Sequence, residues 1–228
     1  GGLQKGSLIV VAGDTSQGKT SLVSAMVLNA AKANHSVAFY SMEMTKTELF
    51  ARMTAGETGI SANKYLYGQL SEEEIKIFDS NLDNLINLPI YFDDKSTSNI
   101  DVILSSIRVM VAKKGIKGAV IDYLQILNVN MKGSNKEQQM GEVARRLKKL
   151  AKDLGIWLIA LSQLKRDASN HVPTINRLRD SGQIAEAADT VILLYRPEKY
   201  NLNYPEPFKN ASTKGTAMID VAKGRNIG

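Results

Sequence analysis

The sequence of 228 residues contains no cysteine, which excludes disulfide bonds, thiolate metal sites and cysteine nucleophiles. It contains two histidines, His35 and His171, so a metal site rich in imidazoles is excluded as well. Aromatic residues make up 6% of the chain, and none is obviously placed to stack on nucleic-acid bases. The chemistry of this chain must therefore be sought in other residue types.

Long apolar runs are also missing. No run approaches the roughly 20 residues that are needed to cross a bilayer. The first apolar run, Leu8 to Ala12, is too short for a signal peptide, and no cleavage site follows it. We therefore expect a cytosolic protein without a membrane partner.

The overall composition is that of an ordinary globular protein. Hydrophobic residues make up 43% and charged residues 23%, which argues against a disordered or fibrous chain. The length fits one core, so we expect residues 1–228 to form a single α/β domain. The formal net charge of +6 suits a polyanionic partner, although many soluble proteins are mildly basic. Both ends look cut, so we expect a fragment of a longer protein.

Apolar segments alternate with longer amphipathic ones. Strands are expected at residues 8–12, 37–41, 88–92, 119–121, 156–161, 190–195 and 216–222. Helices are expected at residues 19–33, 75–85, 99–114 and 137–154, and after a capping box formed by Thr45 and Glu48. In the first helix, Leu22, Met26 and Ala30 are expected to face the core. The alternation predicts a mostly parallel, twisted sheet with helices on both faces and with ligands at the carboxyl ends of the strands.

A complete phosphate-binding motif, G-x-x-x-x-G-K-[ST], spans Gly13 to Thr20. It follows an apolar strand and opens a helix, where several N–H groups and the helix dipole can face one anion. The alternative, a tight turn with an incidental lysine, does not explain a full motif in this context. The predicted ATP-binding residues are Gly13, Asp14, Thr15, Ser16, Gln17, Gly18, Lys19, Thr20 and Ser21.

Three residues supply the groups for a complex of ATP with magnesium, which we expect as cofactors. Lys19 places a positive charge near the β- and γ-phosphates, and the Thr20 hydroxyl can ligate Mg²⁺. Asp122 stands at the tip of a buried strand, where an acid typically orders Mg²⁺ through water. A simple turn acid is the alternative for Asp122, but the phosphate motif favours the metal role.

Glu43 and Gln163 each follow a predicted strand. The Glu43 carboxylate can orient and deprotonate the attacking water. The alternative is an acid at a helix start, stabilised by the helix dipole. Gln163 can sense the γ-phosphate and report its loss to the loop that follows, or it can be a loop glutamine without a role.

Together these residues resemble the C-terminal RecA-like domain of bacterial and phage replicative helicases of the DnaB type. The similar segments are 8–13 with 18–20, 39–44, 121–125, 160–164, 178–182 with 188–189, and 223–226. A lone phosphate loop identifies only a superfamily, whereas this ordered set covers nearly the whole chain. The resemblance implies a RecA-like P-loop ATPase fold.

The resemblance also implies roles for residues around the nucleotide. Glu43 corresponds to the general base, and Arg52 to an arginine that supports the nucleotide site. Arg225 corresponds to an arginine finger and Lys223 to its companion, both acting in trans on the ATP of the adjacent subunit. Such an arrangement makes hydrolysis depend on the geometry of two subunits.

Two segments correspond to loops of the family that line a central channel. Arg179, Asp180 and Gly182 correspond to positions that contact the backbone of single-stranded DNA. Residues 128–136 correspond to a second channel loop. Backbone contacts suit a motor that must pass any sequence.

The implied activity is the unwinding of duplex DNA by a hexamer that translocates 5′ to 3′ at a replication fork, with a primase and a helicase loader as partners. Two alternatives stay open: a RecA-type recombination or repair ATPase, and a non-catalytic ATP-binding regulator. Glu43 and Arg225 argue against the regulator, because a pure binder needs neither residue.

The chain departs from the family pattern at several points. The loop Asp14–Gln17 differs from the arginine-proline version that is common in the family. Gly224 stands where the family usually has a larger polar residue, which implies a more flexible finger. The amino-terminal helical domain and the linker helix of the family have no counterpart in the sequence.

Overall fold

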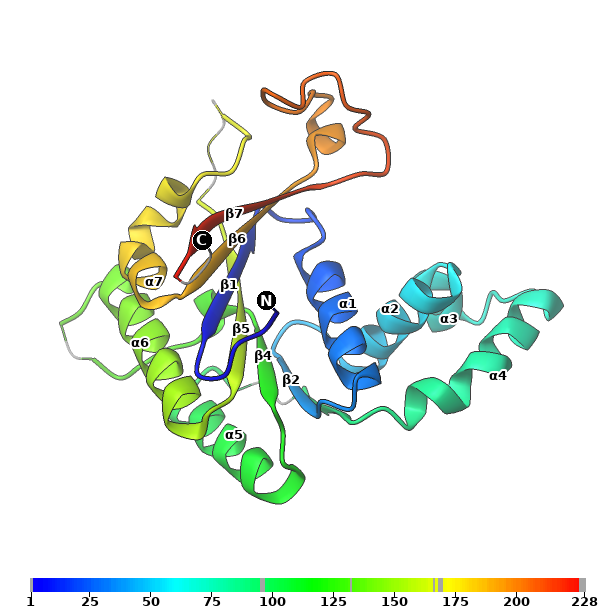
Figure 1. The fold of residues 1–228 in the computed structure, drawn as a ribbon, viewed down its shortest axis with the longest axis horizontal. Helices are drawn as coiled ribbons and strands as arrows, with labels where there is room; N and C mark the ends of the chain where they lie inside the picture. The colour runs from blue at the N-terminus through cyan, green and yellow to red at the C-terminus, as the bar shows by residue number, and fades with distance from the viewer. Residues whose placement is uncertain (1, 95–96, 132, 166, 168–169, 226–228) are drawn as a thin grey trace.

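A computed structural model describes residues 2–94, 97–131, 133–165, 167 and 170–225. Its centre is a seven-stranded sheet in the order β3-β2-β4-β5-β1-β6-β7 (Figure 1). All neighbouring strands are parallel except β6 and β7, which are antiparallel. The strands are β1 (Leu8–Gly13), β2 (Val37–Ser41), β3 (Ile90–Asp93), β4 (Gly118–Asp122), β5 (Trp157–Gln163), β6 (Thr190–Tyr195) and β7 (Met218–Gly224).

Helices cover both faces of this sheet (Figure 1). One core cluster joins the sheet to α5, α6 and α7, and a second joins its other face to α1 and α2. The helices are α1 (Lys19–Lys32), α2 (Lys46–Thr58), α3 (Ala62–Tyr67), α4 (Glu72–Ile86), α5 (Ile100–Lys114), α6 (Lys136–Leu154) and α7 (Gly182–Ala187). Short 3-10 helices are η1 (Leu124–Ile126), η2 (Ile175–Ser181) and η3 (Pro197–Tyr200).

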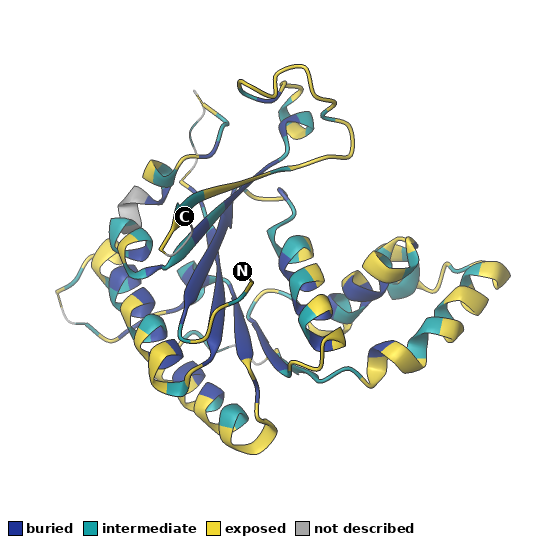
Figure 2. Cartoon of the chain, in the orientation of Figure 1, coloured by how far each residue is buried: buried dark blue, intermediate teal, exposed yellow. Residues whose placement is uncertain are grey.

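The central strands are buried along their whole length, as Figure 2 shows. Every residue of β1 and of β4 is buried, because helices pack on both sides of these strands. Their side chains divide by alternation, so Val10 joins the first cluster and Val11 the second. The mostly parallel α/β fold predicted from the sequence is confirmed.

The predicted capping box at the start of α2 is present. The Thr45 hydroxyl accepts a hydrogen bond from the Glu48 N–H at 3.3 Å, and the Glu48 carboxylate accepts one from the Thr45 N–H at 2.8 Å. Ser71 and Glu74 form the same arrangement at the start of α4. These caps set the point at which each helix begins.

The buried face of α1 differs from the prediction by one residue. Val23, Val27 and Ala31 are fully buried, whereas Leu22 and Met26 are only partly buried. The apolar stripe of α1 is wide, and the sheet contacts its centre rather than the edge that the sequence pattern suggested. Among the described residues, no helix combines the length and the apolarity that a membrane span requires.

Candidate functional site

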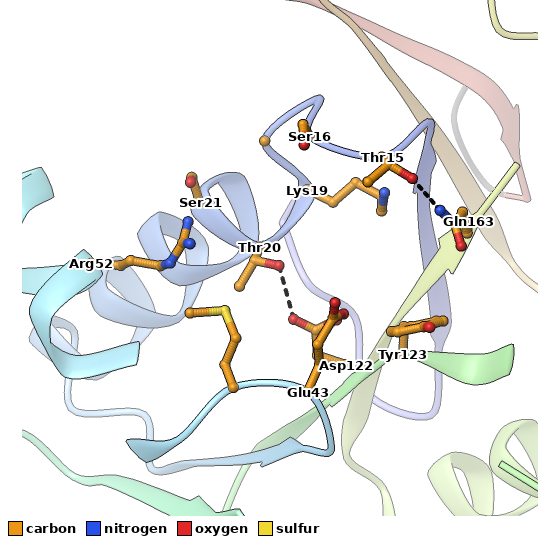
Figure 3. Close-up of a pocket in the computed structure, with 12 residues that line it drawn as sticks. Thr15, Ser16, Lys19, Thr20, Ser21, Glu43, Arg52, Asp122, Tyr123 and Gln163 are labelled. Carbon is orange, nitrogen blue, oxygen red and sulfur yellow. Dashed lines mark hydrogen bonds between the residues drawn. The ribbon is translucent and has the colours of Figure 1, made fainter. Parts of the chain in front are cut away.

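The carboxyl ends of four parallel strands, β1, β2, β4 and β5, surround a single cavity (Figure 3). The loop after β1 leads into α1, Glu43 follows β2, Asp122 ends β4 and Gln163 ends β5. The cavity measures about 280 Å³. It is lined by Thr15, Ser16, Gly18, Lys19, Thr20, Ser21, Glu43, Met44, Arg52, Asp122, Tyr123 and Gln163. The structure therefore brings together predicted site residues that lie far apart in the chain.

The phosphate loop owes its shape to two left-handed residues and one close contact. Ser16 has φ of 61° and Gly18 has φ of 95°, so the backbone curls before α1 begins. A Cβ atom on Gly13 would lie 2.9 Å from the carbonyl oxygen of Leu194. Only glycine at position 13 therefore lets the loop lie this close to β6.

Lys19 extends back across the phosphate loop. Its Nζ donates hydrogen bonds to the carbonyl oxygens of Gly13 at 2.9 Å and Asp14 at 2.8 Å. Burial lowers the pKa of Lys19, and the carboxylates of Asp122, Asp14 and Glu43 oppose that shift. The ammonium group is thus poorly hydrated beside the cavity, where it can neutralise a phosphate.

Thr20 and Asp122 form a pair of oxygen donors at the floor of the cavity. The Thr20 hydroxyl donates a hydrogen bond of 2.9 Å to the Asp122 carboxylate, which is 4% exposed. Burial raises the pKa of Asp122, the bond from Thr20 opposes this, and the charge of Glu43 adds to it. Hydroxyl and carboxylate oxygens are ligands that Mg²⁺ prefers.

No group of three or more histidine, aspartate or glutamate side chains that could hold a metal occurs in the described part of the chain. A magnesium ion at Thr20 and Asp122 would therefore need phosphate and water oxygens to complete its shell. That donor set fits an ion that arrives with a nucleotide.

Glu43 lies on a short loop that is tied to the neighbouring strand. The Met42 N–H donates to the Asp122 carbonyl oxygen at 3.0 Å, and the Met44 N–H donates to the Ser41 hydroxyl at 3.0 Å. The Glu43 side chain is exposed and lies beside Asp122 in the cavity (Figure 3). Arg52 reaches the same cavity from α2.

Gln163 contacts the phosphate loop, and Gln125 holds it in place. The Gln163 side-chain amide donates a hydrogen bond to the Thr15 hydroxyl (Figure 3). Gln125 donates to the Ser162 hydroxyl and to the Gln163 carbonyl oxygen, both at 2.9 Å, and accepts from the Gln163 N–H at 3.2 Å. The sequence assigned no role to Gln125, because nothing in its spacing reveals a contact with β5.

Lys223 and Arg225 lie at the opposite end of the strands from the cavity, beside the first residue of β6. Gly224 pairs with Thr190, which pairs with Ile9, four residues before Gly13. Four residues of strand span roughly 13 Å. Both basic side chains point further away, toward the end of α7, so they are not placed to act on the nucleotide cavity of their own chain.

Carbonyl groups at the end of α7 hold these two cations. Lys223 Nζ donates to the carbonyl oxygens of Ala185 at 2.6 Å and Ala188 at 2.7 Å, and Arg225 donates to that of Glu186 at 2.8 Å. Partial burial and the charge of Arg225 lower the pKa of Lys223. Cations are favoured at a helix C-terminus, where the carbonyl groups lack helical partners.

The segment that was predicted to bind DNA crosses from η2 into α7. Gly182 is the first residue of α7, and the backbone of Arg179 and Asp180 lies in η2. The side chains of Arg179 and Asp180 lie outside the described part of the structure. Residues 128–136 lie between η1 and α6 and include the first residue of α6, and residue 132 among them is not described.

Asp122→Asn is expected to raise the Tm of the metal-free protein and to weaken the further rise that Mg²⁺ with an ATP analogue produces. A raised pKa means that the ionised carboxylate destabilises the folded state at neutral pH, whereas an amide can still accept from Thr20. A gain of about 1 kcal/mol would raise the Tm of a domain of this size by roughly 2–4 °C. Thermal melting with and without both ligands measures the two effects.

The exposed Asp79→Asn serves as the control, and it should change neither value. A lower Tm for metal-free Asp122→Asn would contradict the prediction, because it would show that the charge itself stabilises the fold.

Comparison with known proteins shows which families and structures this chain resembles. The family model of the DnaB-like helicase C-terminal domain matches residues 1–227. The replicative DNA helicase DnaB of Geobacillus stearothermophilus and the replicative DNA helicase DnaC of Bacillus subtilis are each 34% identical over 230 residues, or 99% of this chain. The match covers 49% of each relative, so the chain spans about half the length of these proteins.

Two solved structures have a TM-score of 0.88 with this chain. One of them is an ATPase domain that is 27% identical, and the match covers 98% of this chain and 78% of that one. The other, a DnaB-like replicative helicase described with its interactions with primase, is 28% identical, and the match covers 99% of this chain and 54% of that one. These comparisons confirm the RecA-like fold and the resemblance inferred from the sequence.

Proposed function

Since the chain belongs to the family of DnaB-like helicase C-terminal domains, we propose that it is the ATP-hydrolysing motor of a ring-forming replicative DNA helicase. The observation that carries this proposal is the single cavity that contains Lys19, Thr20, Asp122 and Glu43. These side chains meet the needs of ATP hydrolysis, namely a phosphate cation, magnesium ligands and a base.

Five side chains of the cavity share the steps of the reaction. The N–H groups of the phosphate loop and Lys19 bind the triphosphate, and Thr20 with Asp122 would hold Mg²⁺, which would neutralise charge on the phosphates. Glu43 orients water and accepts its proton, since its exposed carboxylate opens directly into the cavity. Gln163 couples the γ-phosphate end of the cavity to the segment that follows β5.

A neighbouring copy completes the site in this proposal. Lys223 and Arg225 lie at the edge of the sheet opposite to the nucleotide cavity, so they can serve only the cavity of another subunit. An arginine finger supplied in trans stabilises the charge that develops on the phosphates. We propose a hexameric ring in the full-length protein, in which hydrolysis takes place between subunits.

The ring would translocate 5′ to 3′ on single-stranded DNA. Arg179, Asp180 and Gly182 would contact the DNA backbone, in keeping with a net charge of +6 that favours a polyanion. One structural relative is a replicative helicase described with its interactions with primase. We propose a primase and a helicase loader as partners of the full-length protein, acting in the cytoplasm at the replication fork.

A forked DNA substrate tests this function. Full-length protein with ATP and Mg²⁺ is expected to separate a fork that has a 5′ tail, and to leave unchanged a duplex that has only a 3′ tail. Lys19→Ala should abolish strand separation, because the triphosphate loses its main cation. DNA-stimulated hydrolysis without strand separation would instead indicate a RecA-type ATPase, and nucleotide binding without turnover would indicate a regulator.

A further inference from the structure

An ion pair that is largely shielded from solvent joins the phosphate loop to the segment that carries the proposed DNA contacts. Arg177 Nη2 lies 2.6 Å from Asp14 Oδ1, with side-chain exposures of 8% and 16%. Asp14 is the second residue of the phosphate motif, and Arg177 precedes Arg179 by two positions in η2. The two loops are 163 residues apart in the chain.

Arg177 also holds the chain that leaves β5. Its Nε and Nη2 donate to the Lys165 carbonyl oxygen at 2.9 and 2.7 Å, and the Lys165 N–H donates to the Arg177 carbonyl oxygen at 3.3 Å. Lys165 stands two residues after Gln163, whose amide contacts Thr15. One guanidinium therefore connects the phosphate loop, the Gln163 segment and η2.

Asp14 is braced on its other side by η3. The Tyr200 hydroxyl donates to Asp14 Oδ2 at 3.1 Å and accepts from the Gln17 amide at 3.2 Å. The His171 ring stacks on Tyr200 with 4.1 Å between the ring centroids. Because Asp14 is held from both sides, a displacement of Arg177 must either break the ion pair or move the phosphate loop.

The negative charge of Asp14 links this ion pair to nucleotide binding. A carboxylate in a phosphate-binding loop opposes the approach of a triphosphate unless a cation neutralises it. Arg177 supplies that cation from within the protein, so the electrostatic state of the loop depends on where η2 lies. Removing one partner of a buried pair leaves the other charge uncompensated.

We propose that Asp14 and Arg177 are positioning residues through which DNA binding at residues 179–182 controls ATP turnover. This inference rests on the proposed function. In the DNA-bound arrangement, the pair sets the phosphate loop and Gln163 for hydrolysis. When the pair is broken, nucleotide binding and DNA binding become independent of each other.

The test measures ATP turnover of the full-length protein with and without oligo-dT, using D14R, R177D and the exchanged variant D14R/R177D. Each single variant places like charges together and should lose most of the DNA stimulation of kcat. DNA should then also no longer shift the nucleotide affinity, a shift that is usually about 5- to 150-fold between coupled sites. The exchanged variant restores an opposite-charge pair and should recover most of the stimulation. D14N removes the charge of Asp14 but keeps one of its two oxygen acceptors, so it should also lose the stimulation, and it covers the case in which the reversed charges prevent folding.

Each outcome decides between the two proposals. If the wild-type protein shows no DNA stimulation, the proposed function fails and this inference fails with it. If the wild-type protein is stimulated and D14N and the single reversals keep that ratio, only this inference fails. Loss of stimulation without recovery in a folded exchanged variant also overturns it, because the two charges would then not act on each other. If the pair only stabilises the fold, the single variants would lower the Tm and leave the stimulation ratio unchanged. K32E, which breaks the exposed pair with Glu57 between α1 and α2, is the matched control and should leave the ratio unchanged.

Discussion

Arg225→Ala is expected to lower the kcat for ATP hydrolysis of the assembled protein by about 10³- to 10⁵-fold, the range that arginine fingers supply. Binding of ATP should be retained, because Arg225 lies at the edge of the sheet opposite to its own cavity. Phosphate release and fluorescent-nucleotide titration measure the two quantities. Arg108→Ala, at an exposed arginine on α5, should change neither.

Mixing two inactive variants provides a test of action in trans. Copies with Arg225→Ala retain Glu43, and copies with Glu43→Gln retain Arg225. In a random mixture, about a quarter of the head-to-tail interfaces would join an intact cavity to an intact finger. Activity should therefore reappear on mixing, and its failure to reappear while mixed assemblies form would show that Arg225 does not act across an interface.

Glu43→Gln is expected to lower kcat by about 10²- to 10⁴-fold, the usual contribution of a general base, while ATP binding is retained. The amide has nearly the shape of the carboxylate but cannot accept a proton from water. Its neutral charge also removes one of the causes that raise the pKa of Asp122, so binding of Mg²⁺ with nucleotide should not be weakened. Single-turnover hydrolysis and nucleotide titration separate the two effects.

Glu72→Gln is the matched control for the view that Glu43 is merely an acid at a helix start. Glu72 is the first residue of α4 and lies outside the cavity, so its replacement should leave turnover unchanged. Unchanged turnover in Glu43→Gln would refute its assignment as the base.

The sequence predicted well those features whose signals are local. The phosphate motif, the order of the strands along the chain and the capping box of Thr45 and Glu48 each depend on a few adjacent residues, and the structure has all three. Glu43, Asp122 and Gln163 each stand at the carboxyl end of a strand, so parallel strands alone predict that they lie on the same side of the sheet. Their proximity could therefore be predicted from the sequence alone.

Short elements and long-range pairs could not be predicted in this way. α3 and α7 contain six residues each, too few for helical periodicity to appear, and packing rather than propensity stabilises them. The Asp14–Arg177 pair and the contacts of Gln125 join residues that are far apart in the chain. No role could be predicted for Arg177 from the sequence, because an arginine in a polar stretch does not reveal which acidic residue it pairs with in the fold.

The separation between the nucleotide cavity and the Lys223–Arg225 pair has a consequence for stoichiometry. Copies joined through these opposite edges would form an open chain in which one terminal cavity has no partner, so the number of complete sites is one fewer than the number of copies. Closure of the ring would make the two numbers equal. If one interface between subunits opened to admit a DNA strand, the ATP site at that interface would therefore lose its arginine and stop hydrolysing ATP. The other sites would remain complete.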